Sequence, residues 1–331
     1  MWKIGDIEIK GKVVLAPMAG ITSVGYRDFM IPFGISLTYT EMISDMGLIY
    51  GNKETFTYLP SKPSAVPLGV QLFGSDPINL GKAASICEKY TQYFDFFDVN
   101  MACPVPKVTR SGAGSALMQN PKLCGDIIRE IKKNTNKPVT AKIRLSYDMT
   151  NINFKEVIKE LEKAGCDAVA IHPRTRSELY SGQPHYDLVK DLRKEMKIPL
   201  FISGNIYSLD DAIKALEITK ADAVMVARGG MGNPFLVKQL NRYFEAGEVL
   251  DPPSFLEQCD YCLKLGRSMS DDFGEEKAMR IYRGIAPRFF SGFPNSKILR
   301  VTLATSLTDY KSLVKIIDEF KQDFTKIKFW L

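Results

Sequence analysis

About the first 235 residues alternate between two patterns of hydrophobic and polar positions. Short runs of apolar and β-branched residues end in Gly, Pro or a polar residue, and amphipathic stretches of roughly 10–16 residues follow them. Strands that are apolar throughout are typical of a sheet buried on both faces, which is parallel and has helical crossovers. The eight runs are residues 12–18, 35–42, 66–73, 95–101, 138–145, 167–172, 198–204 and 222–227.

The spacing of these runs predicts the fold class. Residues 120–134 and 153–164 read as amphipathic helices, and the second places Phe154, Val157, Ile158 and Leu161 on one face. Eight strand–helix units in about 235 residues is the count of a (β/α)8 TIM barrel. A doubly wound sheet usually has fewer units and a GxGxxG turn after its first strand, where this chain has APMAGIT (16–22). We therefore expect an α/β fold built on a (β/α)8 barrel.

The short apolar runs that predict strands are not found after residue 246. The segment 246–254 carries Gly and two prolines and reads as a linker. From residue 255 to 331 the periodicity is helical. The pattern predicts a TIM-barrel domain over 1–245 and a small all-helical C-terminal domain over 255–331.

Composition narrows the class of protein. The chain has 331 residues, 45% hydrophobic and 25% charged, which excludes disorder as its main state. No apolar run approaches the roughly 20 residues that span a bilayer, and the first residues lack the apolar core of a signal peptide. We expect a cytoplasmic protein with no membrane association. The net charge of +6 permits a polyanionic partner without requiring one.

Cysteine and histidine are few enough to be read individually. The six cysteines read as reduced thiols in a cytosolic chain. Cys259 and Cys262 have CxxC spacing, but a metal would need two further ligands, so we expect no metal. Of the two histidines, His172 ends a predicted strand, whereas His185 lies in a surface-like stretch.

Nearly every predicted strand carries a polar residue near its carboxyl end, where the chemistry of such barrels gathers. Polar groups in buried strands cost desolvation, so this pattern favours a functional site. The residues are Glu41, Gln71, Asn100, Lys142, Arg144, His172, Ser203, Asn205 and Arg228.

The turns after strands seven and eight, residues 203–205 and 227–230, are glycine-rich. Turns at this position are the usual phosphate site of these barrels. A short helix expected at 231–236 would direct its positive end at a phosphate, and Arg228 would add a charged contact. We expect a phosphorylated ligand.

Lys142 and Cys103 are the two reactive groups in informative places. Lys142 stands inside a strand, which leaves three readings: a Schiff-base lysine, a fixed cation beside an electron-rich ring, or an ion-pair partner, for example of Glu41. Cys103 follows strand four and precedes Pro104 and a basic loop with Lys107. A thiol there reads as a nucleophile or a proton donor, whereas a buried structural cysteine suits Cys87, Cys124 and Cys166 better.

Together these residues resemble the tRNA-dihydrouridine synthase family over the whole chain. The stretches that carry the resemblance are APMAGIT (16–22), DVNMACPVPKV (98–108), GAGSALM (112–118), AKIRL (141–145), IHPRTRSELYSG (171–182), SGNI (203–206) and ARGGMGNPFL (227–236). Ala102 and Pro173 stand where the family pattern has glycines, and Ile206 stands where an acidic residue is often found.

The resemblance implies FMN as cofactor, NADPH or NADH as hydride source and tRNA as substrate. Cys103 would be the general acid that protonates C5 of a uracil. The target nucleotide would be held by Asn100, Lys107, Arg174 and Thr175. The flavin would be bound by Pro17, Met18, Ala19, Gln71, Lys142, His172, Ser203, Gly204, Asn205, Ala227, Arg228 and Gly229.

A basic segment between residues 277 and 300 is the candidate contact for the body of the RNA. It holds Lys277, Arg280, Arg283, Arg288, Lys297 and Arg300 without an acidic residue, interleaved with Tyr282, Phe289, Phe290 and Phe293. This composition suits phosphate contacts with some stacking, and the alternative is a solvated helix face over core aromatics. Three rival functions stay open: a flavin-dependent pyrimidine or dihydroorotate dehydrogenase acting on free bases, a Schiff-base lyase using Lys142, and a non-catalytic RNA-binding barrel.

Overall fold

The computed structural model describes residues 2–328, which form two compact units. The first unit joins the residues up to Ala19 to Ile35–Ala227, and the second joins Gly20–Gly34 to the residues from Arg228 onward. The division into independent domains at residues 245–255 stays a prediction.

The first unit contains an eight-stranded parallel barrel, as the pattern predicted. The strands follow the order β3-β11-β10-β9-β8-β7-β6-β4, with the short β5 paired to β6. A parallel bridge between Val14 and Leu37 links the first strand to the last. Each of the eight predicted runs contains one strand: β3 (Val13–Leu15), β4 (Thr38–Tyr39), β6 (Leu68–Phe73), β7 (Phe96–Met101), β8 (Val139–Arg144), β9 (Ala168–His172), β10 (Leu200–Ser203) and β11 (Ala223–Val226). The short β5 (Ile43–Ser44) lies just beyond the second run and was not predicted.

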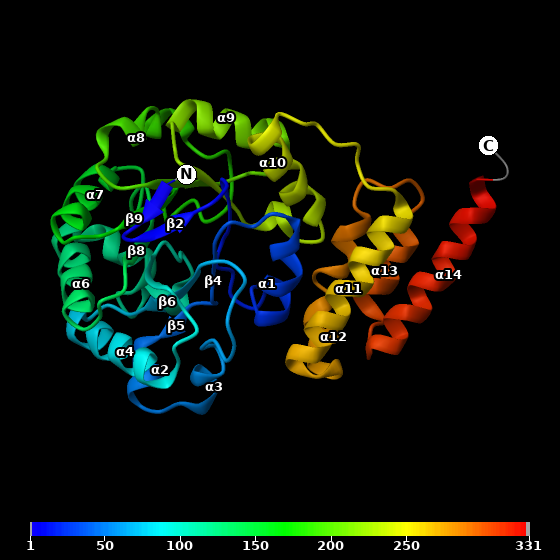
Figure 1. Cartoon of the computed structure of the whole chain (residues 1–331), viewed down its shortest axis with the longest axis horizontal. Coiled ribbons are helices and arrows are strands. Elements are labelled where there is room, and N and C mark those ends of the chain that lie inside the picture. The colour runs from blue at the N-terminus through cyan, green and yellow to red at the C-terminus, as the bar shows by residue number, and fades with distance from the viewer. Residues whose placement is uncertain (1, 329–331) are drawn as a thin grey trace. The chain divides into compact units, whose positions relative to one another are not determined.

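Helices surround the strands of this unit (Figure 1). The helices predicted at 120–134 and 153–164 are α6 (Pro121–Lys133) and α7 (Phe154–Lys163), and α7 buries the predicted face. The other helical segments are α2 (Asp45–Ile49), α3 (Lys53–Phe56), α4 (Pro77–Tyr90), α5 (Pro106–Thr109), η2 (Gly114–Gln119), η3 (Tyr186–Val189), α8 (Leu192–Glu195) and α9 (Leu209–Thr219).

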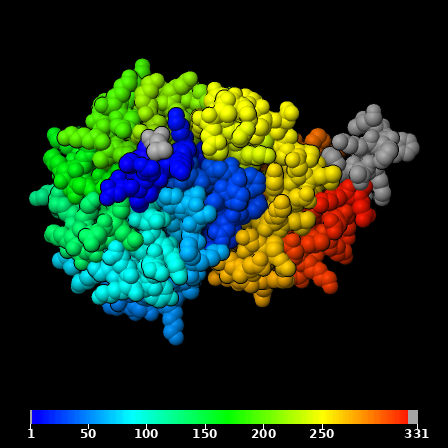
Figure 2. All heavy atoms as spheres, in the orientation of Figure 1, coloured from blue at the N-terminus to red at the C-terminus, as the bar shows by residue number. Residues whose placement is uncertain are grey.

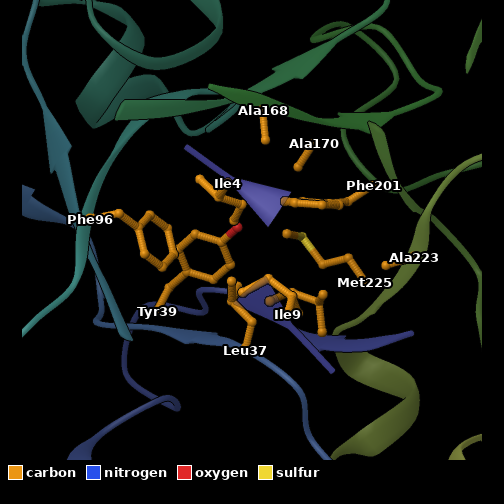
Figure 3. Close-up of a cluster of buried hydrophobic side chains, with 12 residues drawn as sticks. Ile4, Ile9, Leu37, Tyr39, Phe96, Ala168, Ala170, Phe201, Ala223 and Met225 are labelled. Carbon is orange, nitrogen blue, oxygen red and sulfur yellow. The ribbon is translucent and has the colours of Figure 1, made fainter. Parts of the chain in front are cut away.

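A β-hairpin that the sequence pattern did not predict fills one end of the barrel. Strands β1 (Trp2–Ile4) and β2 (Ile7–Ile9) pair antiparallel, and their Ile4 and Ile9 are fully buried. These side chains lie among Leu37, Phe201 and other apolar residues of the barrel interior (Figure 3), while the outer face of the hairpin lies on the surface (dark blue in Figure 2). Because Phe96, Ala168 and Ala223 in this cluster begin their strands, the hairpin occupies the amino-terminal end.

The second unit is helical. Its α1 (Val24–Met30) packs on α11 (Phe255–Phe273): Gly25 N–H donates to Asp272, and Ser268 Oγ donates to the Gly25 carbonyl oxygen over 2.9 Å. A Cβ at Gly25 would lie 2.4 Å from the backbone carbonyl oxygen of Ser268, so only glycine permits this approach. The remaining segments are η1 (Ile31–Phe33), η4 (Arg228–Gly230), α10 (Pro234–Ala246), α12 (Glu275–Tyr282), η5 (Ala286–Phe290), α13 (Lys297–Thr305) and α14 (Tyr310–Lys328).

The short helix expected at 231–236 is wrong in its bounds. Helix α10 begins at Pro234, because Asn233 caps it by accepting a hydrogen bond from Leu236 N–H, and it continues to Ala246. The stretch that reads as a linker follows it, and α11 starts with a capping box between Ser254 and Glu257. Over the described residues, none of the helices is both long enough and apolar enough to span a bilayer.

Candidate active site

Polar side chains project from three neighbouring strands to the inside of the barrel. Strand residues alternate between the two faces, and Thr140 and Lys142 on β8 pair with Ala168 and Ala170, which belong to the interior cluster. The same alternation turns Arg144 inward, toward the carboxyl end of the strand. The apolar layer beside the hairpin thus gives way to polar residues at the mouth where barrel enzymes carry their chemistry.

A continuous hydrogen-bonded chain crosses these strands. Thr140 Oγ1 donates to Asp98 Oδ1 over 2.6 Å, and Gln71 Nε2 donates to Asp98 Oδ2 over 2.6 Å. Asn100 Nδ2 donates to Gln71 Oε1 over 2.9 Å and approaches the sulfur of Met42. Burial raises the pKa of Asp98 to about 6, although both hydrogen bonds and the Lys142 charge oppose the shift.

The side chain of Asn100 also shapes the turn that carries Cys103. Its Oδ1 accepts hydrogen bonds from the backbone N–H groups of Ala102 (3.1 Å) and Cys103 (2.8 Å). On the other side, the Cys103 carbonyl oxygen accepts from the N–H and hydroxyl of Ser115. A Cβ at Gly114 would lie 2.7 Å from that carbonyl oxygen, which explains the glycine.

Cys103 is half-buried, whereas the other five cysteines are buried. Burial raises the pKa of the Cys103 thiol, and the Arg144 and Lys142 charges counter the shift only in part. The thiol is therefore protonated at neutral pH, which suits a proton donor better than a nucleophile. The basic loop beyond it folds into α5 and η2 and leaves Lys107 exposed.

Lys142 is half-buried between Asn100 on one strand and Ala170 on the other. Burial and the nearby Arg144 charge lower the pKa of Lys142 to about 8, while Asp98 and Cys103 raise it. Asp98 is thus a carboxylate that favours the charged form of the lysine.

Arg144 joins two segments at the mouth. Its Nε donates to the Ala102 carbonyl oxygen over 2.8 Å, and its Nη1 donates to the carbonyl oxygens of Thr175 and Leu179. The guanidinium also lies over the ring of Tyr180, 5.5 Å from the centroid. Arg144 therefore fixes the Cys103 turn against the loop after β9.

Two residues expected to hold substrate are engaged within the protein. Arg174 is 1% exposed and donates to Ser181, Gly182 and Asn205, and its Nη1 lies 2.9 Å from His172 Nε2. Thr175 is fully buried, and its N–H and hydroxyl donate to Glu178. Their predicted contact with a nucleotide stays a prediction, and their observed role is to shape the loop.

The predicted phosphate loop after β10 has a strained, glycine-dependent backbone. Gly204 has φ +121°, and a Cβ there would lie 3.0 Å from His172 Cδ2. Asn205 is left-handed at φ 49° and donates through Nδ2 to Gln183, while Tyr186 hydroxyl donates to the Gly204 carbonyl oxygen. The loop therefore brings Gly204 and Asn205 beside His172 and Arg174. Ser203 ends β10 with its side chain buried.

The other predicted cofactor residues follow β3 and β11. Pro17 and Met18 are half-buried and Ala19 is exposed, directly after β3, and Ala227 packs on the interior cluster. Arg228 and Gly229 form η4, which begins the second unit. Binding of a flavin by these residues stays a prediction.

The basic segment of the second unit divides into two groups. Lys277, Arg280 and Arg288 are exposed, whereas Arg283 is half-buried and donates to the Leu307 carbonyl oxygen through Nε and Nη2. The expected stacking of bases on the interleaved aromatics is wrong for Tyr282, Phe289 and Phe290, because all three are in the core of this unit. Phe293 packs on Phe255.

The other singled-out groups have structural surroundings. Cys259 and Cys262 are buried, and Tyr282 hydroxyl donates to the Cys262 carbonyl oxygen over 2.6 Å. His185 lies 2.6 Å from Glu178 through its Nε2. Within the described part of the chain, no three His, Cys, Asp or Glu side chains are grouped so that they could hold a metal ion.

Sequence reasoning missed Asp98 and Thr140, which complete the hydrogen-bonded chain. Both were detectable, because each stands two residues before a predicted site residue and so faces the same side of its strand. Tyr180, stacked on His172 with ring centroids 6.4 Å apart, lies in a loop that gives no such periodic signal.

Comparison with known proteins decides the family. Residues 14–325 match the family model described as dihydrouridine synthase (Dus). The chain belongs to the dihydrouridine synthase family. Members of this family are oxidoreductases, and the chain is therefore an enzyme of that class.

Curated relatives align over nearly the whole length. The chain is 34% identical to tRNA-dihydrouridine synthase B of Pasteurella multocida, covering 96% of this chain and 95% of the relative. It is 33% identical to a probable tRNA-dihydrouridine synthase of Aquifex aeolicus, with 95% and 97% covered. Among solved structures, 6-hydroxypseudooxynicotine amine oxidase of Pseudomonas geniculata N1 matches with a TM-score of 0.56 at 13% identity, covering 80% of this chain and 51% of that one. That likeness concerns the fold alone.

Proposed function

We propose that this dihydrouridine synthase reduces the C5–C6 double bond of uridines in tRNA to 5,6-dihydrouridine, with FMN as cofactor and NADPH or NADH as reductant. The family and the names of the relatives support the reaction and the RNA substrate. The observation that carries the proposal is the half-buried Cys103 thiol on a turn fixed by Asn100, beside the inward cation Lys142. A tRNA substrate also fits the cytoplasmic location predicted from the sequence.

The residues present fit a flavin. Lys142 and the Gln71 amide N–H group are hydrogen-bond donors for the polar edge of an isoalloxazine ring, and Pro17, Met18 and Ala19 would line it. Gly204 and Asn205 have successive positive φ angles, and turns of this kind can present backbone N–H groups to a phosphate. We assign Ser203, Ala227, Arg228 and Gly229 to the same binding function. When bound, FMN would supply the hydride for C6 of the uracil.

The chain's own residues then handle the proton and the position of the base. Cys103 donates its thiol proton to C5, and its raised pKa keeps that proton in place at neutral pH. We assign Asn100, Lys107, Arg174 and Thr175 to the surroundings of the target nucleotide, with Arg174 and Thr175 acting through the loop that they hold. The Lys142 charge stabilises negative charge next to it.

Binding of the RNA body is assigned to the exposed cations Lys277, Arg280 and Arg288 of the second unit. Phosphate contacts of this kind supply affinity without reading sequence. The target base must leave its stack to reach the end of a barrel, as the substrates of other base-modifying enzymes do.

The test is a product assay with the purified full-length protein. The released chromophore is identified, and dihydrouridine is quantified in unmodified tRNA after addition of NADPH or NADH. We expect FMN and dihydrouridine in tRNA, and no reduction of free uridine. Reduction of free pyrimidines with tRNA unchanged would instead establish the dehydrogenase alternative. A protein that binds no flavin and traps a carbonyl substrate on Lys142 with borohydride would establish the lyase.

A further inference from the structure

The hydrogen bonds between the polar side chains on the inner wall of the barrel all run in one donor-to-acceptor order, and two backbone N–H groups determine that order. The N–H groups of Ala102 and Cys103 can only donate, so the Asn100 atom facing them is its carbonyl oxygen. The amide nitrogen of Asn100 must then face Gln71, which therefore presents its own carbonyl oxygen. That leaves the Gln71 nitrogen facing Asp98, where only an acceptor satisfies it.

Asp98 supplies that acceptor from a fully buried position. One of its carboxylate oxygens accepts from Gln71 and the other from Thr140, so both oxygens are engaged as acceptors. Its exposure is 1%, and the positive charge of Lys142 opposes the rise in its pKa that burial causes. The series of hydrogen bonds that begins at Cys103 N–H therefore leads through Asn100 and Gln71 to the buried carboxylate of Asp98.

We infer that Asp98 is a positioning residue: by accepting from Gln71 it locks the orientation of the Gln71 and Asn100 amides and so holds the turn that presents the Cys103 thiol. The inference rests on the proposed function for the role of Cys103 as the acid, but the lock itself is a property of the polypeptide.

Loss of the acceptor would propagate along the chain. In Asp98→Ala the buried Gln71 amide nitrogen lacks a partner, which favours rotation of the amide. Rotation would bring the Gln71 nitrogen against the Asn100 nitrogen, two donors face to face, and would weaken the hold of Asn100 on the turn. In Asp98→Asn an oxygen still accepts from Gln71, while the new amide donates to Thr140 Oγ1, so the orientation is kept.

The alkylation rate of the Cys103 thiol measures how firmly the turn is held. Because Cys103 is half-buried and the five other cysteines are buried, iodoacetamide applied to the native full-length enzyme reports on Cys103. We expect Asp98→Ala to raise its alkylation rate about three- to tenfold, the effect of losing one buried hydrogen bond. Asp98→Asn should restore a rate close to that of the wild type.

A double-mutant cycle distinguishes loss of this specific hydrogen-bond pathway from a general loss of stability of the fold. Gln71→Met disconnects Asn100 from Asp98 at nearly constant volume, and we expect the same increase from it as from Asp98→Ala. The combined variant should show no further increase, because both changes break one pathway. If Asp98→Ala does not fold, Gln71→Met and Asp98→Asn alone decide the matter.

Asp167 offers a matched control. Its carboxylate accepts from Val139 N–H at the opposite end of β8 and from Lys132, and it has no link to Asn100. Asp167→Ala should leave the Cys103 alkylation rate unchanged. An unchanged rate in both Asp98→Ala and Gln71→Met, or an equal rise in Asp167→Ala, would overturn the inference. Because labelling needs no turnover, this result stands whether or not dihydrouridine is formed.

Discussion

Lys142 and Arg144 lie two residues apart on β8 and turn their side chains to the same, inner side of the barrel wall. Each is a cation with a lowered pKa, mainly through burial, and the Arg144 charge further lowers the pKa of Lys142. Arg144 donates hydrogen bonds to backbone carbonyl oxygens. Lys142 instead lies beside Asn100 on the neighbouring strand, and the negative charge of Asp98 raises its pKa. Two like charges on one buried face cost stability, because each disfavours the charged form of the other.

The Lys142 charge predicts a pH dependence of stability. Its folded pKa of about 8 lies below its ordinary value of 10.5, so the cost of burying the charge is fully present below pH 8. The cost disappears as pH rises from 8 to 10.5, and stability should therefore increase over that window by about 2–3 kcal/mol from this group. Other buried groups, such as Cys87 and Cys124 with their raised pKa values, change the stability of both proteins alike, so the difference between the two proteins isolates Lys142. Urea unfolding of the flavin-free protein at pH 7 to 10 should show the free energy of unfolding of the wild type rising by this amount relative to that of Lys142→Met. Parallel curves for the two proteins would contradict it.

Removal of the Cys103 thiol should separate flavin chemistry from substrate protonation. Cys103→Ala should keep its flavin and still be reduced by NADPH, since the thiol takes no part in either event, yet lose about 100-fold or more of dihydrouridine formation. Stopped-flow absorbance and a tRNA product assay measure the two steps. Cys124→Ala, which removes a buried thiol, is the control and should retain product formation. A wild-type rate in Cys103→Ala would exclude the acid role.

The loop at Gly204 should be sensitive to a single added carbon. Gly204→Ala places a Cβ 3.0 Å from His172 Cδ2 at a φ of +121°, where side chains are strained. We expect FMN affinity to fall about tenfold or more, since 1–3 kcal/mol of strain acts on the bound loop. Equilibrium titration of apoprotein with FMN checks this. Gly182→Ala, at a position with open space and also a positive φ, controls for strain away from the loop.

The two kinds of arginine in the basic segment should respond differently. Arg280→Glu with Arg288→Glu should weaken tRNA binding and reduce the slope of log K against log salt by about 2, with flavin content unchanged. Arg283→Ala should instead lower the free energy of unfolding by about 1–3 kcal/mol, because the buried Leu307 carbonyl oxygen loses its donor. Filter binding over a salt series and chemical unfolding distinguish them. Unaltered tRNA binding in the first variant would remove this surface from the interface.

The candidate acid and the residues around it could be predicted from the sequence to different degrees. Cys103 could be singled out because it follows a strand and precedes a proline, both of which are local signals. Asp98 needs only the two-residue alternation of a strand to be placed beside Asn100. Its link to Gln71, however, spans 27 residues and two strands, and no local pattern contains that register.

The sequence by itself determined the barrel. Eight apolar runs of strand length, separated by amphipathic helices, leave few ways to bury every strand on both faces, and the parallel barrel is one of them. Only the tertiary structure decided which polar groups remain for a ligand. Arg174, Thr175 and Arg283 are suitable ligands by residue type, but carbonyl and carboxylate oxygens brought near by the chain already occupy their donors. Likewise Tyr282, Phe289 and Phe290 became core residues, because burial depends on what packs against a helix and not on the residues within it.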